Sequence, residues 1–118
     1  MRKTLCFISI ISFSTLSLAQ HYTASSFKDL FLAAVSYQSV ARVCGDAASI
    51  ETSKQVLRRV INFGENQNLL SAEARYYKKN PEEVIAKGEA QYKKDRYVGC
   101  TQAKEIINQL NEVTKKLP

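Results

Sequence analysis

Residues 27–44 read FKDLFLAAVSYQSVARVC, and this stretch decides the fold because eight of its apolar residues follow one helical spacing. They recur every three or four positions, which places them on one face of a helix. Ser25 and Ser26 precede the stretch and are good N-cap types, while Gly45 can adopt the left-handed conformation that ends a helix. The stretch therefore predicts one long helix that ends at Cys44. Its inner face comprises Phe27, Leu30, Phe31, Ala34, Val35, Tyr37, Ala41 and Cys44.

Two segments after this helix have the same helical spacing. The first runs from about Ile50 to Phe63, with Ser49 as its cap and Gly64 as its stop. A polar, turn-prone stretch follows at residues 65–68. The second segment is shorter, and we expect it to run from about Leu69 to Lys79.

The sequence Asn80-Pro81-Glu82-Glu83 predicts the start of another helix. Asn is a good cap, Pro suits the first helical position, and Glu83 stands where a capping box requires an acidic residue. Gly88 lies inside this helix, where glycine costs about 1 kcal/mol relative to alanine, and close approach of another backbone is one explanation for it. Residues 95–99 then break the pattern.

Thr101 is the predicted cap of a last helix, whose inner face would carry Ala103, Ile106, Ile107, Leu110 and Val113. No alternating run of β-branched residues exceeds a few positions, so strands are not expected. The sequence therefore predicts an all-α fold, a small bundle of four main helices and one short helix.

Residues 1–19 have the three-part layout of a secretory signal peptide. Arg2 and Lys3 precede an uncharged apolar run at residues 5–16, and small residues follow at Ser17 and Ala19. The run is shorter than the ~20 residues that a membrane-spanning helix needs, so we expect cleavage after Ala19. Residue 20 is Gln and not the Cys that a lipoprotein requires. The expected product is a single helical domain, residues 20–118, without a membrane anchor and located in the periplasm or secreted.

Cys44 and Cys100 are the two cysteines that remain after this cleavage. An even number of cysteines in an exported chain indicates a disulfide, and the alternative is a pair of buried free thiols. Because Cys44 ends the first predicted helix and Cys100 opens the last, the bond would join those two helices. It would contribute about 4 kcal/mol by restricting the unfolded chain.

The chemistry-bearing residues do not indicate an enzyme. His21 is the only histidine, so neither a histidine-based triad nor a histidine metal cluster can be assembled. There is no glycine-rich phosphate loop, and we expect no cofactor and no bound metal. Basic runs lie on every predicted helix after the first and are interleaved with Glu. This arrangement favours a solvated polar face over nucleic-acid binding and leaves an acidic protein partner open. These runs are Arg58-Arg59, Lys78-Lys79, Lys93-Lys94-Asp95-Arg96 and Lys115-Lys116.

The order of helices and cysteines resembles that of the small periplasmic pilotins of type II secretion, the PulS/OutS type. The residues that carry this resemblance are Val43-Cys44-Gly45-Asp46, Ile61 to Gly64, Gly88 to Asp95, Val98-Gly99-Cys100, and Ile106, Ile107 and Leu110. In that family a concave groove of the bundle holds a helix formed by the C-terminal segment of a secretin. The resemblance implies such a groove here, with Cys44–Cys100 as the family's bridge. Pilotins are typically lipoproteins, and Gln20 departs from that pattern.

Our main functional hypothesis is therefore a non-enzymatic periplasmic binding protein of pilotin or chaperone type, which holds an amphipathic segment of a secretion-system partner. The expected contacts are aromatic or aliphatic residues on helices that could line one groove. Tyrosine suits a groove rim because its ring can be buried while its hydroxyl stays wet; the alternative role for these rings is to cover a thin core. The expected contacts are Leu30, Val35, Tyr37, Tyr77 and Tyr92.

An alternative hypothesis is a periplasmic immunity protein that inhibits an amidase-like toxin of type VI secretion, to which this chain is similar in size, helicity and disulfide. Its contacts would lie on a protruding loop or helix end, such as Asp95 to Gly99. A third hypothesis is a periplasmic chaperone for stress-unfolded clients, but a single terminal histidine gives little means of sensing mild acid.

Overall fold

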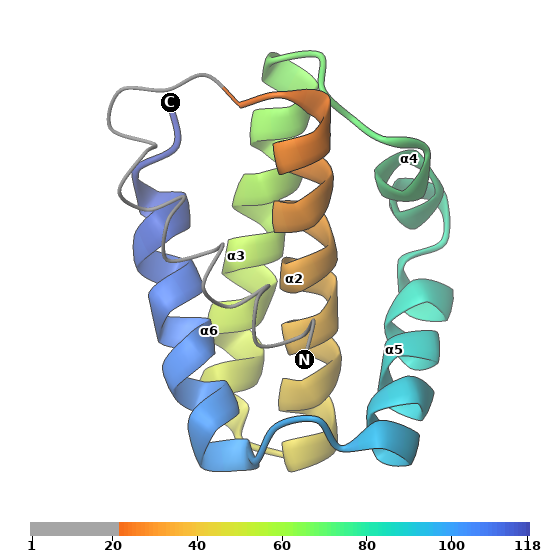
Figure 1. Ribbon diagram of the computed structural model, residues 1–118, viewed down its shortest axis with the longest axis vertical. Coiled ribbons are helices and arrows are strands. Elements are labelled where there is room, and N and C mark those ends of the chain that lie inside the picture. Colours follow the sequence, from red (N-terminus) through yellow and green to blue (C-terminus); the bar gives the residue numbers. More distant parts are fainter. Residues whose placement is uncertain (1–21) are drawn as a thin grey trace.

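The computed structural model describes residues 22–118, so the predicted signal peptide lies outside the described residues. The described chain forms α-helices joined by short connections, as Figure 1 shows, and contains no strand. The predicted all-α fold is confirmed. The helices are α2 (Ala24–Cys44), α3 (Ala47–Asn66), α4 (Ala72–Lys79), α5 (Pro81–Asp95) and α6 (Cys100–Lys115).

Helix α2 is the centre of the domain. Helices α3 and α6 pack against it and against each other, whereas α5 packs against it from the opposite side, with short α4 above α5 in Figure 1. Neighbours on several sides bury more of α2 than one apolar stripe: Gln38, Ser39 and Val40 are buried along with the predicted face. A helix buried on most of its circumference has little amphipathic contrast.

The core has a thick part and a thin part. The thick part lies where α2, α3 and α6 meet, and it includes Leu57 and Val60 of α3 and Leu110 of α6. The layer formed by α4 and α5 buries only Ala74, Ile85 and Tyr92 from its own helices. Most of the apolar stabilisation therefore comes from the three-helix unit.

Helix α2 begins earlier than predicted, because Thr23 rather than Ser25 or Ser26 is its N-cap. The Thr23 hydroxyl accepts a hydrogen bond from the Ser26 amide at 3.1 Å, and the Ser26 hydroxyl accepts one from the Thr23 amide at 2.8 Å. Ser26 is therefore the reciprocal partner in a capping box. The predicted end is confirmed, since Gly45 has a φ of 76°.

Helix α3 is longer than predicted at both ends. It starts at Ala47 with Asp46 as N-cap, and the expected cap Ser49 instead donates a hydrogen bond to the Asp46 carboxylate at 2.7 Å. Gly64 does not stop the helix, which runs on to Asn66. A Cβ on Gly64 would lie within 2.9 Å of both the Phe27 ring and Leu70, so this glycine serves close packing instead of chain reversal.

The start of α5 at Pro81 is confirmed, but the predicted capping box is wrong. Asn80 makes no side-chain cap hydrogen bond, and the Glu83 carboxylate instead accepts one from the Tyr76 hydroxyl at 2.6 Å. The start of α4 lies at Ala72, after the cap Ser71, and not at Leu69.

Helix α6 begins at Cys100, with Gly99 and not Thr101 as N-cap. The break between α5 and α6 that the sequence predicted is present. No helix among residues 22–118 is both long and apolar enough to cross a membrane.

Candidate functional site

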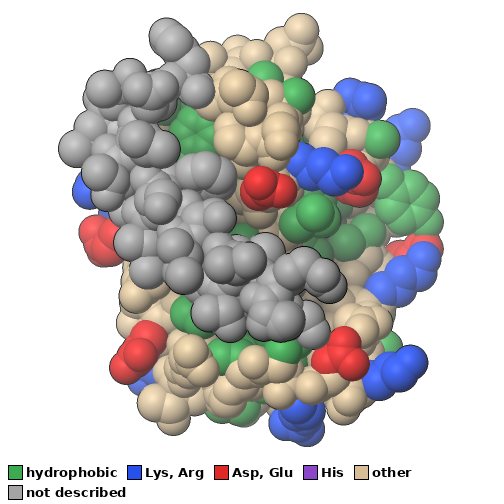
Figure 2. All heavy atoms as spheres, in the orientation of Figure 1, with side chains coloured by type: hydrophobic (Ala, Val, Ile, Leu, Met, Phe, Trp, Pro, Cys, Tyr) green, Lys and Arg blue, Asp and Glu red, His purple; other side chains and the backbone are tan. Residues whose placement is uncertain are grey.

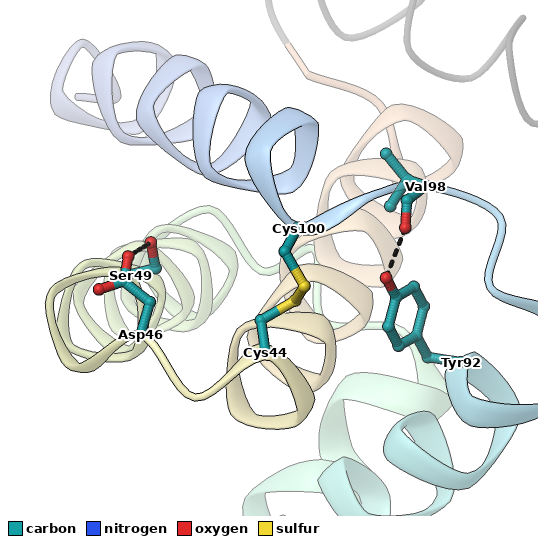
Figure 3. Close-up of a disulfide and its surroundings, with 6 residues drawn as sticks. All are labelled: Cys44, Asp46, Ser49, Tyr92, Val98 and Cys100. Carbon is teal, nitrogen blue, oxygen red and sulfur yellow. Dashed lines mark hydrogen bonds between the residues drawn. A yellow bond between two sulfur atoms is a disulfide. The ribbon is translucent and has the colours of Figure 1, made fainter.

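The disulfide joins the end of α2 to the start of α6, as predicted (Figure 3). The bond links Cys44 and Cys100 with a Cα–Cα distance of 5.8 Å across a sequence separation of 56 residues. The closed loop contains α3, α4 and α5. The connection between α5 and α6 is therefore anchored covalently to the end of the central helix.

Residues 92–100, which we call the tethered segment, are held by further contacts beside the disulfide. The Tyr92 hydroxyl donates a hydrogen bond to the Val98 carbonyl (Figure 3), and both residues are buried. The Tyr97 ring packs edge-on against Tyr92 and Tyr37, with ring centroids 5.5 and 6.3 Å away. These contacts fix the segment between its two ends.

Arg96 occupies a conformation that is rare for its residue type. It ends α5 with φ 46° and ψ 51°, in the left-handed region. Its guanidinium carbon lies 5.3 Å from the centroid of the Tyr92 ring, which places the cation over a ring that is itself hydrogen-bonded.

The tethered segment also concentrates positive charge. Within the described chain, Lys93, Lys94 and Arg96 take part in none of the ion pairs, whereas bases elsewhere often do. On the face drawn in Figure 2, basic and acidic side chains lie beside one another at several places. Asp95 lies among these three bases, and its carboxylate accepts a hydrogen bond from the Gln91 amide at 2.5 Å. The end of α5 therefore presents cationic groups on a fixed backbone.

A cavity of about 200 Å³ adjoins the disulfide on the side of α3 and α6. Buried Ala41, Ala103 and Ile107 form its apolar lining, with Asp46 and Lys104 at its polar side. The hydrogen bond from Ser49 is the largest cause that lowers the pKa of Asp46, and the charge of Lys104 lowers it further. The cavity is smaller than the roughly 300–1,000 Å³ of typical small-molecule sites.

The residues expected to line a groove are mostly in the core. Leu30, Val35, Tyr37 and Tyr92 are 0, 8, 2 and 1% exposed, because they lie on or against the central helix. Tyr77 is partly buried and packs edge-on against Phe31 at 5.9 Å. The structure brings Tyr37 and Tyr92 together around Tyr97, but it does not place the five residues on one open surface. Their role in partner binding stays a prediction.

Sequence reasoning located the break at residues 95–99 but did not predict the contacts within it or the backbone conformation of Arg96. The spacing of the sequence does place Tyr92 on the same face of its helix as Ile85, seven residues or two turns earlier, but that spacing does not reveal the hydrogen bond from Tyr92 to Val98. The left-handed state of Arg96 had no signal in the sequence, because no glycine or asparagine stands at that position.

Within residues 22–118, no group of three or more His, Cys, Asp or Glu side chains is arranged to hold a metal ion. No family model, no curated protein and no solved structure matches this chain.

Proposed function

We propose that this chain is a non-enzymatic protein-binding protein of an oxidising, extracytoplasmic compartment, and that it binds a folded partner through the tethered segment. The observation that carries the proposal is the fixed geometry of that segment, which the disulfide, the Tyr92–Val98 hydrogen bond and the Tyr97 ring contacts restrain. A binding segment ordered in advance loses less conformational entropy on association. The disulfide supports the compartment, because such bonds persist where conditions are oxidising.

A fixed helix end suits insertion into a concave site on a folded protein better than it suits the capture of a flexible segment. This is the mode of contact expected of a periplasmic immunity protein that covers the active-site cleft of an amidase-like toxin. The proposal is therefore closest to the immunity hypothesis. It does not need the buried residues of α2 to become accessible.

The test is capture from periplasmic extract with oxidised protein, residues 20–118, followed by mass spectrometry. A triple variant, Lys93→Gln, Lys94→Gln and Arg96→Gln, removes the charge of the tethered segment. The control, Lys54→Gln, Lys79→Gln and Lys116→Gln, removes the same charge elsewhere. We expect the control but not the triple variant to retain a cell-wall hydrolase and to inhibit it. Equal capture by both variants would exclude the tethered segment as the contact.

A second candidate function is the pilotin or chaperone type, and the layer of α4 and α5 favours it. Ion pairs anchor this layer to the rest of the domain: Lys28–Glu73 at 3.3 Å, Arg42–Glu82 at 3.1 Å and Arg42–Glu89 at 2.6 Å. The pairs with Glu73 and Glu82 involve exposed carboxylates and contribute little stability, whereas the Arg42–Glu89 pair is partly buried.

The interface beneath this layer also contains an unsatisfied polar atom. One face of α2 carries, by helical spacing, Phe31, Val35, Gln38 and Arg42. On this face Phe31 contacts α4 and Arg42 contacts α5. The buried Gln38 Oε1 has no hydrogen-bond partner, which weakens an interface. Displacement of the layer would expose Phe31 and Val35 to an amphipathic segment, such as the C-terminal segment of a secretin.

This second candidate is tested with a synthetic peptide of that secretin segment. We expect peptide binding to increase amide hydrogen exchange in α4 and α5, and Tyr77→Ala to weaken it. Tyr76→Ala is the control, because Tyr76 is exposed and its hydroxyl bonds to Glu83 of α5. Unchanged exchange in α4 and α5 on peptide binding would exclude displacement.

A further inference from the structure

We infer that Arg96 is the anchor of the interface and that the surface it enters on the partner is rich in carboxylates. This inference rests on the proposed function, since it names the chemistry of the partner that the tethered segment binds.

The backbone of Arg96 gives the first reason. Among residues 22–118, only Asn68 and Arg96 are non-glycine residues with positive φ, at 57° and 46°. Asparagine is enriched in this conformation, and glycine adopts it without steric cost. The chain uses glycine for the same purpose at the end of α2, where Gly45 has a φ of 76°. The backbone conformation at position 96 by itself favours glycine, so the arginine side chain needs a role that offsets this cost.

The position of the Arg96 side chain gives the second reason. The Arg96 guanidinium lies over the Tyr92 ring, and Tyr92 is fixed by its hydrogen bond to the Val98 carbonyl. No carboxylate of the described residues pairs with Arg96, whereas Arg42 pairs with both Glu82 and Glu89. A stacked guanidinium keeps its edge donors, which match a carboxylate in a bidentate geometry.

The surrounding charge gives the third reason. Lys93 and Lys94 stand one turn or less before Arg96 and pair with no carboxylate of the described chain. They also stabilise the carboxyl end of α5 through its dipole. These three cations outnumber the one carboxylate among them, Asp95. They therefore give one end of the bundle a positive potential, which attracts and orients an acidic protein surface.

The test uses ¹⁵N-labelled oxidised protein, residues 20–118, titrated with poly-L-glutamate and, separately, with a DNA duplex at the same anionic charge. We expect poly-L-glutamate to shift the amide signals of residues 93–97 first. Arg96→Gly should weaken this binding at least tenfold while the melting temperature stays equal or rises. Lys116→Gln, which removes one charge at the other end of the bundle, should leave binding within about twofold.

Three outcomes would overturn the inference. One is a lower melting temperature of Arg96→Gly with unchanged binding, which would make the side chain structural. Another is an equal response around Lys54, Lys79 and Lys116, which would show non-specific attraction. The third is tighter binding of the DNA duplex at residues 93–97, which would indicate nucleic acid.

The two proposals fail separately. If the extract yields a partner whose binding survives Arg96→Gly, the proposed function stands and the role of Arg96 falls. If poly-L-glutamate binds through Arg96 and the extract yields no protein, the carboxylate site stands and the proposed function falls.

Discussion

The side chain of Ser39 occupies the space that a Cβ on Gly88 would need. Such an atom would lie 2.8 Å from the Ser39 Cβ and nearer still to its Oγ. The Ser39 hydroxyl shares its proton between the carbonyls of Val35 at 3.0 Å and Ile85 at 3.1 Å. Helices α2 and α5 thus approach closely at this point. A close approach was one explanation for Gly88 from the sequence, and the neighbour is a side chain and not a backbone.

Gly88→Ala should destabilise the domain in spite of the higher helix propensity of alanine. The propensity gain is about 1 kcal/mol, but an added methyl group in a fully packed contact costs about 1–3 kcal/mol and would disturb both hydrogen bonds of Ser39. We expect a net loss of about 1 kcal/mol or more, measured by urea denaturation.

Gly99→Ala is the matched control, because a Cβ on Gly99 would meet nothing within 4 Å and its φ is −80°. The lower entropy of the unfolded chain then offsets the weaker N-cap, so the change should stay within about 0.5 kcal/mol. A stable Gly88→Ala protein would show that α5 moves away from α2 at little cost.

Removal of the disulfide should lower stability by about 4 kcal/mol, because the bond closes a long loop of the unfolded chain. Cys44→Ser with Cys100→Ser is compared with the wild type by urea denaturation, with and without reductant. Reductant should lower the stability of the wild type to that of the double variant and leave the stability of the double variant unchanged. An unchanged wild type in reductant, with its thiols shown to be free, would contradict this expectation.

The long, periodic segments were predictable because burial of an apolar face determines them. Phe27 to Cys44 and Ala103 to Val113 follow helical spacing, and the structure places both as expected. The cysteine pair was predictable because Cys44 and Cys100 stand at the ends of two predicted helices, and because an even pair of cysteines fits the export that the sequence predicts.

Helix ends and the role of single tyrosines were less predictable, since they depend on tertiary neighbours. Ser49 and Asp46 are both capping types, and only the fold selects Asp46. Gly64 resembles a helix stop until Phe27 and Leu70 are seen packing on it. Tyr37 and Tyr92 resemble groove residues until α2 proves to be central, with helices on opposite sides.

Tyr92→Phe should loosen the tethered segment without removing the ring contact with Tyr97. The substitution deletes the hydroxyl that donates to the buried Val98 carbonyl, and an unsatisfied buried acceptor costs about 1–3 kcal/mol. We expect lower stability in urea and faster amide exchange in residues 96–99.

Tyr76→Phe is the control for this substitution. Tyr76 is 46% exposed, and its hydroxyl bonds to the exposed Glu83, so water can replace the lost donor. Equal losses of stability in Tyr92→Phe and Tyr76→Phe would show that the Tyr92 hydroxyl does not hold the tethered segment.

Acid should weaken the start of α3 through Asp46. Its pKa lies below the ordinary value of 3.8, first because Ser49 donates a hydrogen bond to the carboxylate and further because Lys104 lies nearby. A carboxyl whose pKa is lower in the folded state stabilises the fold above its unfolded pKa, and this contribution is lost as the pH falls through the folded value. Wild type and Asp46→Asn should therefore differ most in stability near neutral pH and converge below about pH 4. Urea denaturation from about pH 7 to about pH 2 measures the difference in stability. The pKa values of Glu73 and Glu83 are also lowered, but their contributions to stability cancel in the comparison because both proteins keep these residues. A difference that stays constant through the acid range would contradict the assignment to Asp46.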